Sequence, residues 1–128
     1  MADIKTFLTP EEVFRLHPRI RWAAFSRDSG EVVFSHMREG VESHTSEVDD
    51  RAFMELGALI MSSAAEKLTP SQRAGELESI VVNLEKDSVM LMKVRNGHLA
   101  ISADKADASE VFLKVTPIIR ERYAGSKG

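Results

Sequence analysis

Residues 88–95 (SVMLMKVR) constrain the fold more than any other part of the sequence. The side chains of a strand alternate between its two faces, and in this run both alternating sets are largely apolar. A strand that is apolar on one face only can leave the other face to water, but a strand that is apolar on both must be covered on both. The sequence therefore predicts a sheet that lies between two layers of helices.

Turn residues and apolar periodicity divide the chain into eight elements. Thr9-Pro10-Glu11-Glu12 combines an N-cap, a first-turn proline and the acid of a capping box. Asn96-Gly97 separates two apolar runs and predicts a hairpin in which both turn residues take positive φ. The predicted helices cover residues 10–17, a segment from 46 or 49 to 67 and a segment from 104 or 107 to 123, and the predicted strands cover 20–26, 31–37, 77–84, 88–95 and 98–103.

This order, α-β-β-α-β-β-β-α, predicts an α/β (α+β) fold with a five-stranded, mostly antiparallel sheet. Tight turns join most of the strands, and such turns connect antiparallel neighbours. We expect the central helix to cover one face of the sheet and the first and last helices to cover the other. The predicted architecture is a three-layer α/β/α domain.

Composition narrows the class of protein. The 128 residues carry a formal net charge of −3, with 43% hydrophobic and 29% charged side chains, which predicts one soluble domain over 1–128 with an ordered core over about 9–123. The absence of cysteine excludes disulfides and thiolate metal sites and fits a cytoplasmic location. The acidic balance argues against nucleic-acid binding. The first residues show no secretory signal, and we expect no direct membrane insertion.

The central helix carries more apolar surface than one sheet face requires. Its apolar arc spans roughly 200°, against the roughly 100° that a one-sided helix needs. The stripe expected to face the sheet consists of Phe53, Gly57, Ile60 and Ala64, with Leu56 and Leu68 beside them. A second stripe consists of Met54, Ala58, Met61 and Ala65, and Leu59 lies apart in the polar sector. Either the helix is buried deep in its own chain, or the second stripe meets a partner, most simply a second copy across a two-fold axis. We favour the second interpretation, in which the stripe contacts a partner.

Element order and local sequence together resemble the roadblock family, the dynein-light-chain-type domains related to longin and profilin folds. The resemblance rests on the hairpin turn Asp28-Ser29-Gly30, on the segments MELGALIMSSAAEKL, ELESIVVNLEKDSV and VMLMKVRNGHLAIS, and on the capped last helix after ADKADASE. It covers about residues 9–123. It implies a homodimer or heterodimer formed through the central helix and the third strand, with the two sheets joined into one.

The resemblance also implies a role and an interface. Roadblock domains mostly serve as dimeric platforms for small Ras-like GTPases, motor complexes or membrane-recruitment scaffolds, and they share no catalytic motif. The interface positions that the resemblance carries over are Met54, Ala58, Met61, Ala65, Glu78, Ile80 and Val82. We therefore expect a non-enzymatic interaction module that pairs with itself and has a small GTPase or another protein as partner.

The sequence offers little chemistry of its own. It has no GxxxxGK[ST] element and no GxGxxG after a strand, so it is not expected to be an enzyme or to need a cofactor. His36 and His44, with Glu39, Glu42 and Glu47 nearby, are the remaining metal candidates. Their spacing is not a recognised ligand pattern, and we interpret this segment as solvated loop, with no metal site.

An alternative function is a small-molecule sensor of PAS or profilin type, in which the sheet and helices enclose a ligand. Such a pocket needs a few polar groups directed into an apolar cavity. The sequence shows no such cluster, so the interaction module is the prediction we favour.

Overall fold

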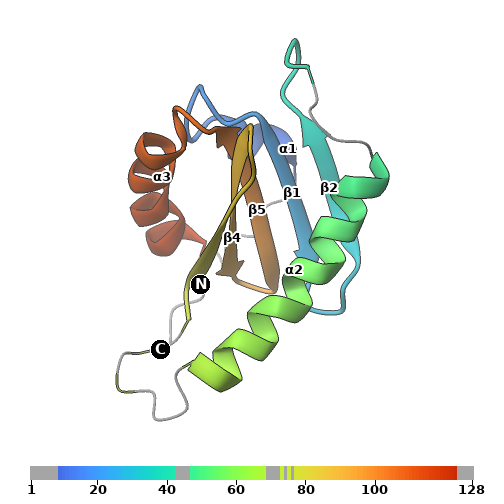
Figure 1. The fold of residues 1–128 in the computed structure, drawn as a ribbon, viewed down its shortest axis with the longest axis vertical. Coiled ribbons are helices and arrows are strands. Elements are labelled where there is room, and N and C mark those ends of the chain that lie inside the picture. The colour runs from blue at the N-terminus through green and yellow to red at the C-terminus, as the bar shows by residue number, and fades with distance from the viewer. Residues whose placement is uncertain (1–8, 43–46, 69–72, 74, 76, 124–128) are drawn as a thin grey trace, which may run out of the picture.

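Five strands and three helices make up the part of the chain that the computed structural model describes, namely residues 9–42, 47–68, 73, 75 and 77–123 (Figure 1). The side chains of residues 47–49, 62, 64–66 and 68 lie outside this description. The helices are α1 (Pro10–Phe14), α2 (Glu47–Leu68) and α3 (Ala108–Arg122). The strands are β1 (Trp22–Arg27), β2 (Val32–Met37), β3 (Ser79–Asn83), β4 (Asp87–Val94) and β5 (Gly97–Asp104).

The strands form one sheet in the order β2-β1-β5-β4-β3, and every neighbouring pair is antiparallel. This confirms the predicted five-stranded sheet and the predicted order of elements. β2 and β3 are the two edges of the sheet, so each has one side without a strand neighbour among the described residues.

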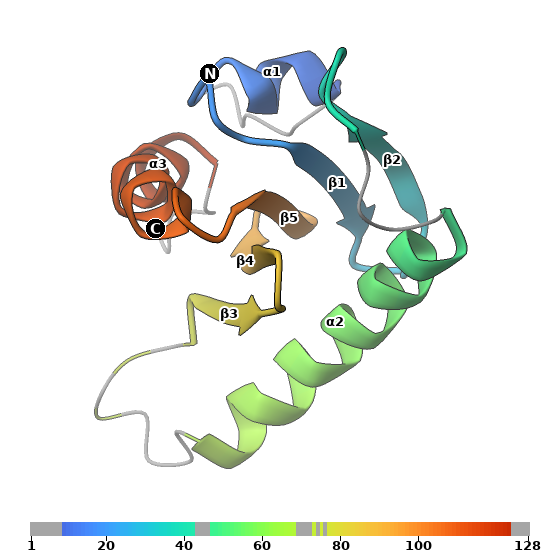
Figure 2. The ribbon, with the colours of Figure 1, turned by 45° about the horizontal axis from the view of Figure 1, so that its top comes forward.

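The three layers are as predicted. Figure 2 shows α1 and α3 on one side of the sheet and α2 on the other. A large buried cluster joins the sheet to α1 and α3, and includes Phe25, Ile101 and Val115. A smaller cluster joins the sheet to α2, and includes Trp22 and Met54. The sheet therefore has a buried face on each side, and burial of each such side chain contributes about 1.5–3 kcal/mol.

Strand β4 accounts for this arrangement. Met90 and Met92 belong to the cluster under α3, whereas Val89 belongs to the cluster under α2. Leu91, on the same face as Val89, lies against Gly57 of α2. The two apolar sets of residues 88–95 thus point to the two helical layers, as the sequence predicts.

The boundaries of several elements differ from the prediction. α1 ends at Phe14 rather than His17, and its start has the predicted capping box, in which the Glu12 carboxylate accepts a hydrogen bond from the Thr9 N–H at 3.2 Å. The β4–β5 turn consists of Arg95 and Asn96, not of Asn96 and Gly97. Asn96 takes the left-handed conformation, with φ of 67°, but Gly97 does not and already pairs with Val94. The prediction that Gly97 is a turn residue is wrong by one position.

Candidate interaction surface

The orientation of α2 differs from the prediction. Met54 and Met61, assigned to an exposed second stripe, are only 1% and 4% exposed. Gly57 between them is buried, and a Cβ at this position would overlap the end of the Leu91 side chain. The helix therefore approaches the sheet most closely at Gly57, and the two methionines fill the space on either side of that contact.

The other apolar side of α2 is exposed instead. Leu56 is 57%, Leu59 is 63% and Ile60 is 41% exposed, and these three residues are called the outer stripe below. We predicted that Leu56 and Ile60 face the sheet. This prediction is wrong, because the close contact of Gly57 with Leu91 turns the methionine side of α2 to the sheet instead. Ala58 lies between the two sides and is half-buried, and the side chain of Ala65 lies outside the described residues.

Strand β3 supplies the remaining predicted interface positions. Glu78 is exposed just before it, and Ile80 and Val82 are half-buried. Ile80 pairs with Leu91 and Val82 with Val89, which places both on the α2 face of the sheet. Paired residues of neighbouring strands share a face. Ile80, Val82 and the outer stripe of α2 therefore lie on the same side of the sheet, whereas the Glu78 carboxylate accepts hydrogen bonds from Arg120 of α3.

The β3 edge is open to further pairing. Its five residues (SIVVN) include no charge and no proline, the residues with which proteins commonly block an edge strand. Val81, in the middle of β3, is 47% exposed, and Leu84 just after it is 42% exposed. Val81 pairs with Met90 and so lies on the opposite face from α2, towards α3.

The exposed large apolar side chains of the described residues are Leu56, Leu59 and Ile60 on α2, Val81 and Leu84 at the β3 edge, and Leu113 on α3. The outer stripe lies on the α2 face of the sheet, whereas Val81 and Leu113 lie on the α3 face. The opposite edge strand, β2, has no exposed large apolar side chain. Several exposed apolar residues close together on one helix are typical of a protein–protein interface, whereas single exposed apolar residues are not. Leu84 and Leu113 were not among the positions predicted from the sequence.

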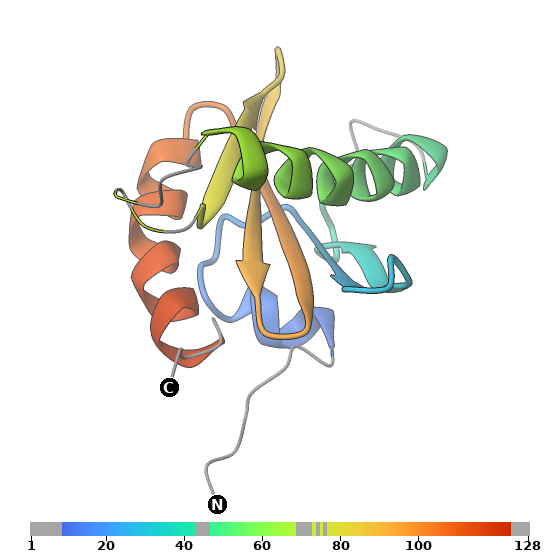
Figure 3. The ribbon, with the colours of Figure 1, turned by 90° about the horizontal axis from the view of Figure 1, so that it is seen from below.

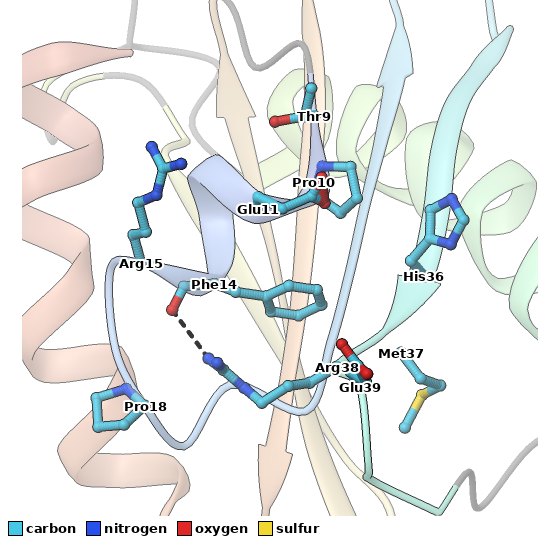
Figure 4. A pocket seen from close by; sticks show the side chains of 10 residues that line it. All are labelled: Thr9, Pro10, Glu11, Phe14, Arg15, Pro18, His36, Met37, Arg38 and Glu39. Carbon is cyan, nitrogen blue, oxygen red and sulfur yellow. Dashed lines mark hydrogen bonds between the residues drawn. The ribbon is translucent and has the colours of Figure 1, made fainter.

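The pocket at the other edge is lined by α1, the following turn and the end of β2 (Figure 4). Its volume is about 820 Å³, and its lining includes Phe14 and Met37. Arg38 lies with its guanidinium 4.8 Å from the centre of the Phe14 ring.

The guanidinium of Arg38 is used by the protein itself. It donates hydrogen bonds of 2.7–2.9 Å to the carbonyl oxygens of Phe14, His17 and Ile20. Partial burial lowers the pKa of Arg38, but a guanidinium stays charged at physiological pH. Arg38 therefore fixes α1 and the turn after it to β2, and its hydrogen-bonding groups are largely committed to that role.

The histidines form no metal site in the described part of the chain, where no three His, Asp or Glu side chains come together. His36 is exposed in the pocket wall, while His44 and the side chain of Glu47 lie outside the described residues. Burial and the neighbouring Lys93 lower the pKa of His98, which favours its neutral form.

None of the helices in the described part of the chain combines the length and the hydropathy that crossing a bilayer requires.

Comparison with known proteins identifies the fold. No protein-family model matches the sequence, and no curated protein matches it. Among solved structures, the chain is similar to a Roadblock/LC7 domain from Streptomyces avermitilis, with a TM-score of 0.63, 14% identity and coverage of 87% of this chain and 88% of that one. It is also similar to MglB of Myxococcus xanthus, with a TM-score of 0.61, 17% identity and coverage of 84% and 85%. An MglB structure described as a tetrameric arrangement matches with a TM-score of 0.58, 15% identity and coverage of 88% and 85%. The chain has a roadblock-type fold, as the resemblance in sequence predicts.

Proposed function

We propose that this chain is a cytoplasmic, non-enzymatic interaction module that forms a homodimer through α2 and the edge of β3. The dimer then presents its joined sheet and flanking helices to a small Ras-like GTPase. The observation that carries the proposal is the exposed outer stripe of α2, which lies on the same face of the sheet as Ile80 and Val82 of the unblocked edge strand β3. A second copy would cover the outer stripe and extend the sheet at the same time.

The similar structures support self-association. The class of partner rests on the family resemblance alone. One of these structures is described as MglB with a tetrameric arrangement, which supports assembly of several chains of this fold. The small GTPase is the partner class that the roadblock resemblance implies.

A native mass spectrum tests the proposal in one measurement. We expect the purified chain to appear at twice its mass of 14.2 kDa, and to gain the mass of one GTPase when a small Ras-like GTPase from the same cell is added with a GTP analogue. The same GTPase loaded with GDP is the control for nucleotide dependence. A single chain at high micromolar concentration would contradict the dimer, and a dimer that binds neither nucleotide form would contradict the partner.

The pocket beside α1 favours a second candidate, the small-molecule sensor. Its volume of about 820 Å³ is within the range of ligand sites. In the same mass spectrum this function would give one chain with the added mass of a ligand. Because Arg38 already serves the three carbonyl groups, the interaction module remains the function that we propose.

Val81→Cys tests the predicted pairing of β3 with its copy. Val81 is the central residue of β3, so an antiparallel pair across a two-fold axis centred on the strand places the two Val81 residues opposite each other. Their Cα atoms would then be about 4.5–5.5 Å apart, which is suitable for a disulfide. Since the natural chain has no cysteine, each variant has a single thiol. We expect mild oxidation to give a covalent dimer in non-reducing electrophoresis.

Ser29→Cys, in the exposed β1–β2 turn, is the matched control and should stay uncrosslinked at the same concentration. Equal crosslinking of both variants would show random collision, and would argue against pairing at β3.

A further inference from the structure

The second edge of the sheet, β2, is as open to pairing as β3, and the proposed dimer does not use it. Its six residues (VVFSHM) include no proline and no Lys, Arg, Asp or Glu, the residues that commonly block an edge strand. Figure 3 shows β2 at the side of the sheet away from β3. Pairing of β3 with a second copy would therefore leave a β2 strand free at each outer edge of the joined sheet.

Two residues of β2 direct their backbone hydrogen-bonding groups away from the sheet. The Arg38 N–H, just after β2, donates to the Arg21 carbonyl oxygen at 2.7 Å, in line with the pairing of β2 with β1. In an antiparallel pair, successive residues direct their N–H and C=O groups to alternate sides of the strand. The groups of His36 therefore face β1, whereas those of Ser35 and Met37 face outward. A peptide strand added at this edge would exchange hydrogen bonds with both outward-facing residues.

The pocket beside α1 lies at the end of this edge. His36 is exposed, and it shares a face of β2 with Phe34, which belongs to the cluster under α1 and α3. The pocket lining joins His36 to Phe14 and Pro10 of α1 (Figure 4). A peptide residue directly opposite His36 would form a non-hydrogen-bonded pair with it, the kind in which side chains lie closest. Its side chain would share the α1 face and reach the pocket beside the ring of Phe14.

The charges around the pocket favour a basic peptide. The exposed carboxylates of Glu11 and Glu39 belong to the lining, and neither makes an ion pair within the part of the chain that the structure describes. Of the two arginines in the lining, Arg38 already donates to three carbonyl oxygens, and Arg15 lies on the side of the pocket away from β2 (Figure 4). A lysine or arginine next to the apolar residue of the peptide would therefore be close to carboxylates that it can neutralise.

We propose that the free edge of β2 and the pocket beside α1 bind an extended, basic peptide segment of a partner protein. The peptide adds a strand to the sheet through Ser35 and Met37, places one apolar side chain on Phe14, and holds a lysine or arginine near Glu11 and Glu39. The site goes beyond the proposed function and does not depend on the dimer, because it lies at the other edge of the sheet. The outward backbone groups beside the pocket favour a peptide over a small molecule, which would leave them unused.

The test uses displayed peptides of about ten residues, in which threonine alternates with apolar residues, lysine or arginine, selected on the wild-type protein. We expect titration calorimetry with a selected peptide to give one peptide per chain. Ser35→Pro removes the outward N–H and should weaken binding by about tenfold or more. Ser35→Ala is the matched control: it also loses the hydroxyl that accepts a hydrogen bond from Trp22, but it keeps the N–H and should bind as the wild type does.

Charge reversal and amide exchange give two further measurements. Glu39→Lys should weaken binding several-fold, whereas Glu121→Lys, the same change at an exposed position of α3, should not. Hydrogen exchange of the Ser35 and Met37 amides should slow when the peptide is bound, while that of the His36 amide, already directed to β1, should change little. The exchange measurement uses the wild-type protein, so it tests the site even if Ser35→Pro fails to fold.

Several results would overturn the site. They are a failure to select any peptide, a preference for peptides without lysine or arginine, and unchanged exchange of the Ser35 amide on binding. A small molecule that copurifies in the pocket would assign it to the sensor function, and self-association lost only in Ser35→Pro would assign the edge to a second copy. Either result would also overturn the proposal. A monomeric wild type that still binds one peptide would contradict the dimer alone, so the two failures are distinguishable.

Discussion

Leu59→Asp is expected to convert the dimer into a folded monomer. Leu59 is 63% exposed in the single chain, so an aspartate there is solvated and leaves the fold intact. In the dimer the same carboxylate would be removed from water beside the apolar side chains of the second copy, at a cost of several kcal/mol. We expect the dimer dissociation constant to rise by at least about 100-fold, which corresponds to about 2.7 kcal/mol. Light scattering gives the mass, and circular dichroism shows that the fold persists.

Met61→Asp is the contrasting variant on the same helix. Met61 is 4% exposed within its own chain, so the new carboxylate would be buried in the monomer itself. We expect this variant to lose its thermal transition rather than its partner. If Met61→Asp folded as a monomer while Leu59→Asp stayed dimeric, the interface would lie on the methionine side of α2, and the outer stripe would have no role in pairing.

These two variants test the orientation of α2, which the sequence did not determine. An apolar arc of roughly 200° is compatible with two orientations of α2 that differ by a partial rotation about its axis, and periodicity alone does not choose between them. The choice depends on Gly57, whose missing side chain allows close contact with Leu91. That contact joins residues 34 positions apart and exists only once β4 is in place. The sequence therefore predicted that the helix has a spare apolar side, but not which side it is.

The architecture was easier to predict from the sequence, because it depends on local patterns that agree with one another. The two apolar faces of residues 88–95 required a helical layer on each side, and the turns between strands required antiparallel pairs. The exposure of Val81 was not accessible from the sequence, since it results from the edge position of β3 and from the placement of α3 over β4 and β5.

Gly97→Ala is expected to destabilise the fold more than the same change at any other described glycine. A Cβ at Gly97 would overlap the carbonyl oxygen of Ser26 and lie 2.9–3.0 Å from the ring of Phe25. The overlapping atom belongs to the backbone of β1, which is held in register with β5 by its pairs with His98 and Gly97. The strand cannot move aside without breaking this pairing at the centre of the sheet. We expect a loss of about 3 kcal/mol or more, and a melting temperature lower by roughly 10 °C or more.

Gly97→Asn distinguishes lack of space from the need for positive φ. Asparagine tolerates the left-handed conformation, so it would be accepted if Gly97 were a turn residue, as the Asn-Gly pattern predicted. Since Gly97 has no positive φ and its limit is the contact with β1, Gly97→Asn should destabilise at least as much as Gly97→Ala. Gly57→Ala is the comparison: there the added methyl meets the end of the Leu91 side chain rather than backbone, so we expect a smaller loss of stability than in Gly97→Ala. A Gly97→Ala variant that melts within a few degrees of the wild type would show that β1 and β5 can separate locally, and the close contact would then not be a determinant of the fold.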